Sequence, residues 1–84
     1  MTPIDRRPII LQILAEIAPD IELDQIRDEV NFRDQFDFDS LDFLRFVTAL
    51  DRRFGATIGE TDYPRLSSLK GCLNYYDEKT RDVA

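Results

Sequence analysis

An all-α bundle is the fold class that the sequence predicts, with three main helices, one short helix and a long loop between the first two main helices. Apolar residues recur three or four positions apart in two long stretches and in a shorter one near the C-terminal end. No segment alternates apolar and polar residues as a half-exposed strand would. The 84 residues suffice for one domain, so residues 1–84 are expected to form a single unit.

The first helix is expected over about residues 6–18. Its apolar residues lie at positions i, i+3, i+4 and i+7 and define one face: Ile10, Ile13, Leu14 and Ile17. Asp5 is a candidate N-cap, because a short polar side chain can accept the free amides of the first turn. Pro19 ends the helix, because the residue before a proline avoids helical backbone angles.

Residues 19–38 are expected to form a long and strongly acidic loop. Nine carboxylates lie between Asp20 and Asp42, against two arginines. Apolar residues are nonetheless spread through the loop: Ile21, Leu23, Ile26, Val30, Phe32 and Phe36. These side chains predict an ordered loop that packs on the core, with a short turn around residues 24–27. Long ordered loops in small domains often carry function.

The second helix is expected over about residues 39–54, with Asp39 as its N-cap and Gly55 as its stop. Its apolar stripe is interpreted as Leu41, Leu44, Val47, Leu50 and Phe54. A short helix is expected at about residues 60–65. The last helix is expected over about residues 68–77, followed by a charged tail.

The composition argues against autonomous catalysis. The chain contains no histidine, which removes the commonest general base near neutral pH and the commonest metal ligand. Cys72 is the only cysteine and cannot form an internal disulfide or a metal cage, so we interpret it as a core residue of the last helix. The sequence therefore predicts a protein that is not an enzyme and holds no metal.

Charge and hydropathy restrict the expected partners and location. The formal net charge is −6, so nucleic acid is not an expected partner. No apolar run approaches the length of a membrane span, and the N-terminal apolar stretch, broken by Gln12 and Glu16, lacks the pattern of a signal peptide. We expect a cytoplasmic monomer that does not insert into membranes.

The segment most suggestive of function is residues 37–42, with the sequence DFDSLD, where the acidic loop meets the second helix. A serine in the first turn of a helix exposes its hydroxyl to other proteins. The free amides and the dipole of a helix N-terminus also favour a phosphate group at this place. Ser40 is therefore a candidate modification site.

The chain resembles the acyl carrier protein family over nearly its whole length. Residues 39–41, with the sequence DSL, match the modification motif of the family, and residues 47–54 follow its V-x-A-L-x-x-x-F pattern. Residues 66–76 match the start and the body of its last helix. Together with the spacing of the flanking helices, these matches are far more specific than the three-residue motif alone.

The resemblance implies a carrier function for this chain. A phosphopantetheinyl transferase would attach 4′-phosphopantetheine from coenzyme A to Ser40, and the thiol of this arm would hold acyl groups as thioesters. Leu41 would be the neighbouring apolar contact, and Asp39 and Asp42 would flank the attachment site. The remaining partners would be the enzymes that load and accept the acyl group.

Departures from the family pattern suggest a specialised carrier in a lipid or secondary-metabolite pathway. Asp37 stands where the family usually has glycine, and Phe38 and Phe43 replace small or polar residues. Three arginines lie in a stretch that the family usually fills with acidic residues: Arg45, Arg52 and Arg53. The docking residues expected from this pattern are Phe38, Asp42, Phe43 and Arg45. Phe38 and Phe43 are expected to form an exposed recognition patch.

Other interpretations remain open for the sequence alone. Ser40 can serve only to cap the helix. Asp37 and Asp39 can be read as calcium ligands, although Leu41 and Asp42 occupy positions where an EF-hand needs an oxygen ligand and a glycine. The same fold can also serve an aminoacyl or peptidyl carrier, or a non-catalytic interaction module that uses no arm.

Overall fold

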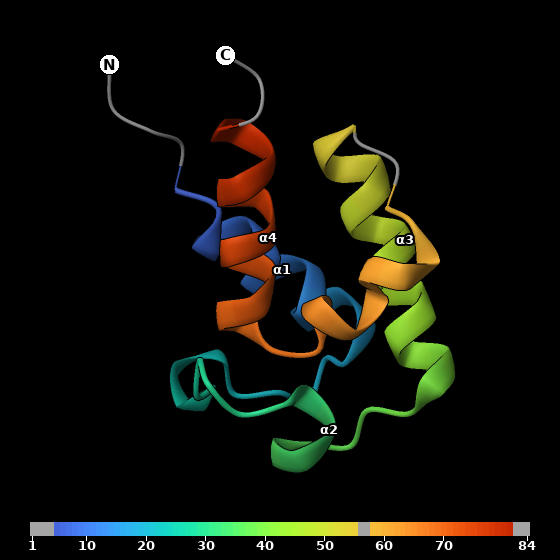
Figure 1. The fold of residues 1–84 in the computed structure, drawn as a ribbon. Helices are drawn as coiled ribbons and strands as arrows, with labels where there is room; N and C mark the ends of the chain where they lie inside the picture. The colour runs from blue at the N-terminus through green and yellow to red at the C-terminus, as the bar shows by residue number, and fades with distance from the viewer. Residues whose placement is uncertain (1–4, 56–57, 82–84) are drawn as a thin grey trace.

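Six helical segments follow one another in a computed structural model that describes residues 5–55 and 58–81 (Figure 1). The segments are α1 (Arg7–Ile17), the 3₁₀ turn η1 (Leu23–Gln25), α2 (Phe32–Gln35), α3 (Ser40–Phe54), the 3₁₀ helix η2 (Glu60–Leu66) and α4 (Leu69–Arg81). No strand occurs among the described residues. The prediction of an all-α bundle is confirmed.

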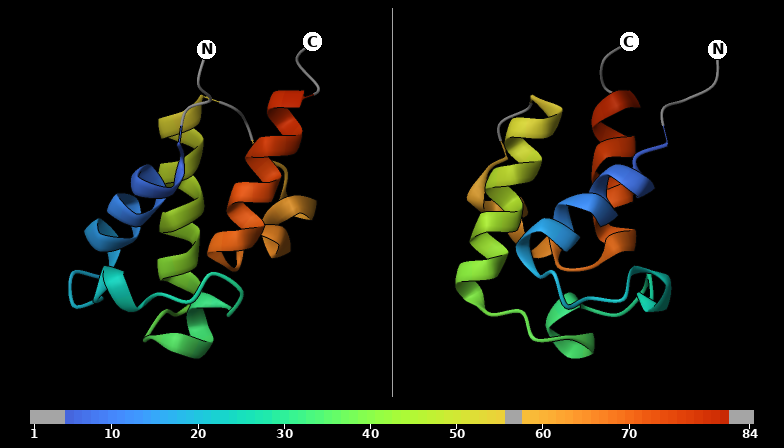
Figure 2. Two further views of the ribbon diagram at one scale, coloured as in Figure 1. Left: turned by 90° about the vertical axis from the view of Figure 1, so that its left-hand side faces the viewer. Right: turned by 180° about the vertical axis from the view of Figure 1, so that it is seen from behind.

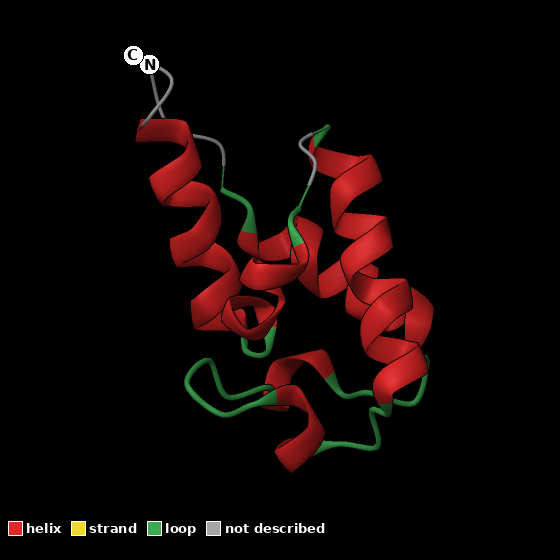
Figure 3. Cartoon of the chain, turned by 45° about the vertical axis from the view of Figure 1, so that its right-hand side comes forward, coloured by secondary structure: helices red, strands yellow, loops and turns green. Residues whose placement is uncertain are grey.

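Three long helices, α1, α3 and α4, form the bundle. Helix α1 contacts both α3 and α4, and η2 contacts α4. In Figure 1, η2 lies between α3 and α4. The loop that contains η1 and α2 crosses the end of the bundle at which α3 begins (Figure 2 and Figure 3). The acidic loop therefore leads directly into the first turn of α3.

The acidic loop is held in place by polar contacts to α1 and to the start of α4. The Arg7 guanidinium donates two hydrogen bonds to the Asp28 carboxylate, at 2.5 and 2.7 Å. These bonds lower the pKa of the Asp28 carboxyl below its ordinary value. The amides of Phe32 and Lys70 donate to the carbonyls of Ser67 and Asp28, at 2.8 and 2.9 Å. The loop is thus tied both to the helix that precedes it and to the start of α4, which is distant in sequence.

The ends of α1 are set by its two flanking prolines. Pro8 lies in the first turn, where its missing N–H costs no intrahelical bond. Arg6, and not Asp5, occupies the N-cap position. The Asp5 carboxylate still accepts a hydrogen bond from the Arg7 amide, at 3.1 Å. At the other end, the helix stops at Ile17, two residues before Pro19.

Helix α4 is longer than the sequence suggested. The expectation of a charged tail after residue 77 is wrong as far as Arg81, because this segment continues the helix. Glu78 forms an ion pair with Arg65. The Lys79 ammonium lies 5.3 Å from the centre of the Tyr75 ring. Glu78, Lys79 and Arg81 are good helix formers, and the contacts of Glu78 and Lys79 hold the last turns in place.

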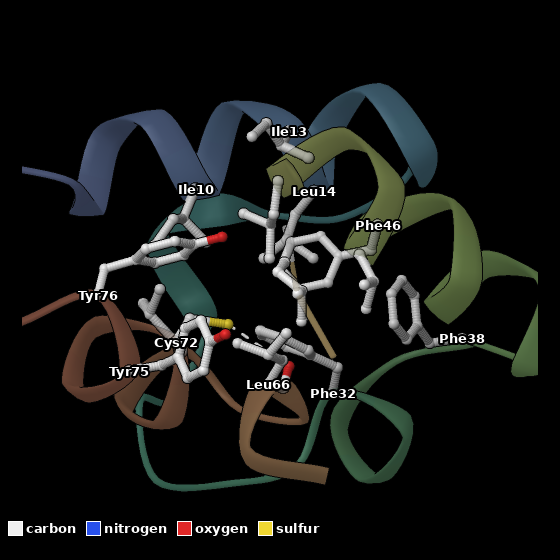
Figure 4. Packing of buried hydrophobic residues seen from close by; sticks show 14 residues of the cluster. Ile10, Ile13, Leu14, Phe32, Phe38, Phe46, Leu66, Cys72, Tyr75 and Tyr76 are labelled. Carbon is white, nitrogen blue, oxygen red and sulfur yellow. Dashed lines mark hydrogen bonds between the residues drawn. The ribbon is translucent and has the colours of Figure 1, made fainter. Parts of the chain in front are cut away.

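Aromatic rings fill the core where the loop meets α3. Phe32, Phe38 and Phe46 are each at most 6% exposed. Their ring centres lie 5.3–6.1 Å apart in edge-to-face arrangements, which are favourable for aromatic pairs. Figure 4 shows these three rings together at one side of the core, with Tyr75 and Tyr76 of α4 at the other.

Cys72 is fully buried in this core, as expected. Its thiol contacts the Leu66 carbonyl at 3.4 Å. Burial raises the pKa of the Cys72 thiol well above the ordinary range, because the thiolate would lose its hydration. The group is therefore a packed, neutral side chain, and the prediction of a structural role is confirmed.

The buried face of α3 differs from the expected stripe. Phe46, Val47 and Leu50 are buried, whereas Leu41 and Leu44 are 54% and 49% exposed. The first two turns of α3 carry phenylalanines and leucines on different sides, so spacing alone does not select one. The aromatic cluster of the loop packs with the phenylalanine side, which leaves both leucines facing outward.

Candidate functional site

Ser40 is the first residue of α3, and its side chain is exposed. Among the described residues, its hydroxyl makes no hydrogen bond. The capping role that the sequence left open for Ser40 belongs instead to Asp39, which occupies the N-cap position. The hydroxyl is thus available to an external reagent, at the end of a helix where negative charge is favoured.

A reciprocal capping box fixes the turn that carries Ser40. The Asp42 amide donates to the Asp39 carboxylate at 2.8 Å, and the Asp39 amide faces the Asp42 carboxylate at 3.4 Å. Two donors that a helix N-terminus would leave free are thereby satisfied. Both acidic neighbours of Ser40 are therefore engaged with the backbone, and the arrangement is that of a cap rather than a calcium loop.

Phe38 is buried, so the expected exposed patch of Phe38 and Phe43 is not formed. Phe38 directly precedes the N-cap, and Phe43 is the fourth residue after the N-cap. Their ring centres are 6.4 Å apart. Apolar residues at these two positions form a hydrophobic staple, which sets the angle at which the chain enters the helix. Phe38 is 6% exposed and Phe43 is half-buried, so both rings support the Ser40 turn from the side of the core.

An apolar groove of about 250 Å³ begins at Ser40. Its walls come from the loop, from α3 and from the η2–α4 segment: Phe32, Arg33, Phe38, Asp39, Ser40, Phe43, Tyr63, Pro64 and Ser67. The rings of Phe43 and Tyr63 lie 6.4 Å apart and join the α3 wall to the η2 wall. Sites for drug-sized ligands span about 300–1,000 Å³, so this groove holds only a short group.

Sequence reasoning missed the contribution of η2 to this groove. Tyr63 and Pro64 belong to no matched motif, and they line the groove beside Ser40 only because η2 packs between α3 and α4. Residues brought together by tertiary packing leave no signal in local spacing. For another wall of the groove the sequence does contain a signal. Phe38 and Phe43 occupy the positions of a hydrophobic staple, which predicts that Phe38 turns inward.

The remaining expected docking residues are Asp42 and Arg45, and both lie on α3 with Leu41, which was expected beside the attachment site. Leu41 and Arg45 are exposed on α3, while Asp42 is partly covered by the capping box. Asp37 is exposed at the end of the loop. Leu41 follows Ser40 directly in the first turn of α3, whereas Asp37 and Arg45 are exposed side chains on either side of this turn in the sequence.

Two features absent from the described residues bear on the alternatives. Within residues 5–55 and 58–81, no group of three His, Cys, Asp or Glu side chains is arranged to hold a metal ion. In the same part of the chain, no helix has the length and apolar character needed to cross a membrane.

Comparison with known proteins places this chain in a family. The profile of the phosphopantetheine attachment site matches residues 8–75, which include Ser40 and every wall of its groove. The acyl carrier protein of Chloroherpeton thalassium is 31% identical over 58 residues, which cover 69% of this chain and 72% of the relative. That of Lactobacillus johnsonii is 34% identical over 55 residues, covering 66% and 69%. That of Zymomonas mobilis is 29% identical over 58 residues, covering 69% and 74%.

Proposed function

Because this chain belongs to the phosphopantetheine attachment family that includes the acyl carrier proteins, we propose that Ser40 carries 4′-phosphopantetheine and that acyl groups travel as thioesters on this arm. Members of the family are carriers and not catalysts. The residue that holds the arm, the group that the arm carries and the partner enzymes are all parts of this proposal.

The state of the three serines is the observation that supports Ser40. The Ser67 hydroxyl contacts the Pro64 carbonyl at 2.9 Å. The Ser68 hydroxyl accepts a hydrogen bond from the Gly71 amide at 3.1 Å. Ser40 alone among the three has an exposed hydroxyl with no hydrogen bond to any described residue. It also stands in the DSL motif, at a capped helix N-terminus that favours a phosphate.

The proposed modification is a phosphoryl transfer in which this chain supplies the nucleophile. The Ser40 oxygen forms a bond to the phosphorus that carries pantetheine in coenzyme A, and the bond from this phosphorus to the nucleotide breaks. The serine proton passes to a base of the transferase, because the chain has no histidine and both neighbouring carboxylates cap the helix. The amides of Ser40 and Leu41 have no intrahelical acceptor, so they favour the phosphodiester that results.

The groove beside Ser40 bears on the cargo. Its size, about 250 Å³, and its aromatic walls favour a short or aromatic group, or the first part of a longer chain, close to the arm. We therefore retain the proposal of a specialised carrier in a lipid or secondary-metabolite pathway. Its partners would be a phosphopantetheinyl transferase and the enzymes that load and accept the acyl group.

The proposal further takes the chain as a monomer in the cytoplasm. Its buried cysteine is a free thiol, which fits a compartment where disulfides are rare.

Intact-mass measurement tests the proposal. The full chain is incubated with coenzyme A and a phosphopantetheinyl transferase, beside Ser40→Ala and the matched control Ser67→Ala. We expect a mass gain of one phosphopantetheine group in the natural sequence and in Ser67→Ala, and none in Ser40→Ala. A gain that persists in Ser40→Ala would place the arm elsewhere. If the natural sequence gains no mass, the chain is an interaction module without an arm.

The cargo requires a second measurement. Holo protein isolated from its native cell is analysed by mass spectrometry for the group bound to the arm. An acyl group supports the proposal, whereas an amino acid or a peptide would make the chain an aminoacyl or peptidyl carrier.

A further inference from the structure

A second and larger groove lies between α1 and α3. These two helices pack against each other (Figure 2). The volume of the groove is about 710 Å³. Side chains from both helices supply an apolar floor, which includes Ile13, Leu44 and Ala49. Ser40 is not part of this groove, but Leu44 stands one helical turn from it. The groove is therefore a separate surface that begins next to the proposed arm.

The wall of this groove is basic in an otherwise acidic chain. Three arginines of α3 line it, Arg45, Arg52 and Arg53, against a single carboxylate, Glu16. The chain as a whole has a net charge of −6. All three arginines are exposed, and none takes part in the ion pairs formed within the described residues. Their guanidinium groups are thus available to carboxylates of another molecule, which they match in bidentate geometry.

The distribution of charge selects a compact partner. Nucleic acid or an anionic membrane would extend beyond the groove and meet the acidic loop. Most of the nine carboxylates between Asp20 and Asp42 lie in this loop. A single protein helix covers only the groove. Arg45 and Arg52 are seven residues apart, or about 10.5 Å along α3 at ~1.5 Å per residue. Two acidic residues seven positions apart on a partner helix have the same separation.

We propose that the groove between α1 and α3 binds an amphipathic helix of a partner protein. The apolar side chains of that helix enter the groove, and its flanking Asp or Glu residues pair with Arg45 and Arg52. Exposed Leu41 and Leu44 extend the apolar contact toward Ser40. This inference rests on the proposed function, because it places the partner's helix beside the arm that delivers the cargo. The partner surface is acidic and apolar.

A displayed peptide library tests this chemistry directly. Each member of the library is a helical peptide of about ten to fourteen residues. Its apolar residues are fixed at helical spacing, and the flanking positions vary among Glu, Lys and Gln. Selection on the full chain is expected to enrich Glu at two positions seven apart. Selection on Arg45→Glu/Arg52→Glu is expected to enrich Lys there instead. No charge preference, or the same preference for both proteins, would overturn the proposal.

Two matched proteins make the result specific. The selected acidic peptide is titrated into ¹⁵N-labelled protein, and perturbed amide signals are expected along α1 and α3. Arg45→Glu/Arg52→Glu is expected to weaken binding at least about tenfold. The control Arg27→Glu/Arg33→Glu changes the net charge equally on the loop and is expected to leave the affinity unchanged. Equal losses in both proteins would show a general charge effect and refute the groove.

The two proposals fail separately in this design. Ser40→Ala is expected to bind the acidic peptide as the natural sequence does, whatever the outcome of the mass measurement. Vesicles of equal parts phosphatidylglycerol and phosphatidylcholine, and a single-stranded oligonucleotide, are titrated alongside. If either binds through the groove as tightly as the peptide and loses affinity on Arg45→Glu/Arg52→Glu, the partner is not a protein helix.

Discussion

Gly71 of α4 packs directly on the backbone of η2, and its replacement by alanine tests the packing that positions one wall of the Ser40 groove. A Cβ atom built at Gly71 overlaps the backbone carbonyl oxygen of Arg65 and lies 3.2 Å from the carbonyl carbon. Backbone atoms cannot rotate away as a side chain does. Since carbon contacts are favourable at about 3.5–4.0 Å, η2 and α4 must separate by a distance on the order of 1 Å.

The expected cost is that of overpacking a close contact. We expect Gly71→Ala to lower the free energy of unfolding by about 1–3 kcal/mol. In a domain of this size, each kcal/mol lowers the melting temperature by about 4–8 °C. The displacement also moves η2, which carries Tyr63 and Pro64 of the groove wall. Urea denaturation followed by far-ultraviolet circular dichroism measures the loss, because the chain has no tryptophan.

Gly59→Ala is the matched control for this prediction. A Cβ at Gly59 meets only the Thr61 hydroxyl, at 3.8 Å, and the backbone φ of Gly59 is −73°. Both replacements remove the same conformational freedom from the unfolded chain, so their difference isolates the contact at Gly71. We expect Gly59→Ala to be as stable as the natural sequence or slightly more so. Equal stability of the two variants would refute the close packing of α4 on η2.

Two further predictions concern the cap and the loop. Asp39→Ala removes the acceptor of the Asp42 amide, and we expect it to lower the free energy of unfolding in urea by about 0.5–2 kcal/mol. Asp39→Asn keeps an acceptor and is expected to cost much less. Similar losses in both variants would show that the cap does not stabilise α3. The pKa of the Asp28 carboxyl is lowered in the folded protein. The ionised carboxylate therefore stabilises the fold at pH values above the ordinary pKa, and this contribution is lost as the pH falls through the lowered pKa. The natural sequence should therefore exceed Asp28→Asn in stability at pH 7 by at most about 1 kcal/mol, because the pair is partly exposed, and the difference should vanish in acid. A difference that persists unchanged in acid would show that it does not come from the Arg7–Asp28 pair.

Helix positions were predictable from the sequence because their signals are local. The two prolines around α1 and the glycine after α3, whose φ is +69°, act on the residues beside them. The serine of the DSL motif was predictable for the same reason, since its N-cap precedes it directly. The end of α4 carries no such local signal: the charged segment after Tyr76 is typical of a tail in composition, but Glu78, Lys79 and Arg81 are also good helix formers.

The rotation of α3 about its own axis was not predictable from spacing. Leucines and phenylalanines alternate through its first two turns, and either set gives a plausible helical stripe. The choice is made by Phe32 of the loop, whose ring packs on Phe46 at 5.3 Å. That contact joins residues that no local pattern relates. The outward position of Leu41 and Leu44, and with it the α1–α3 groove, follows from this tertiary packing.

The rigidity of the Ser40 turn links the fold to the proposed function. The capping box, the staple of Phe38 and Phe43, and the aromatic cluster all act on the same turn. A flexible arm attached there starts from a fixed point and a fixed direction relative to α3. A partner that binds along α3 therefore places its own reactive centre within reach of the arm, whose effective concentration is set by arm length and docking geometry. Under this reasoning, the side chains that orient α3 control delivery without touching the cargo.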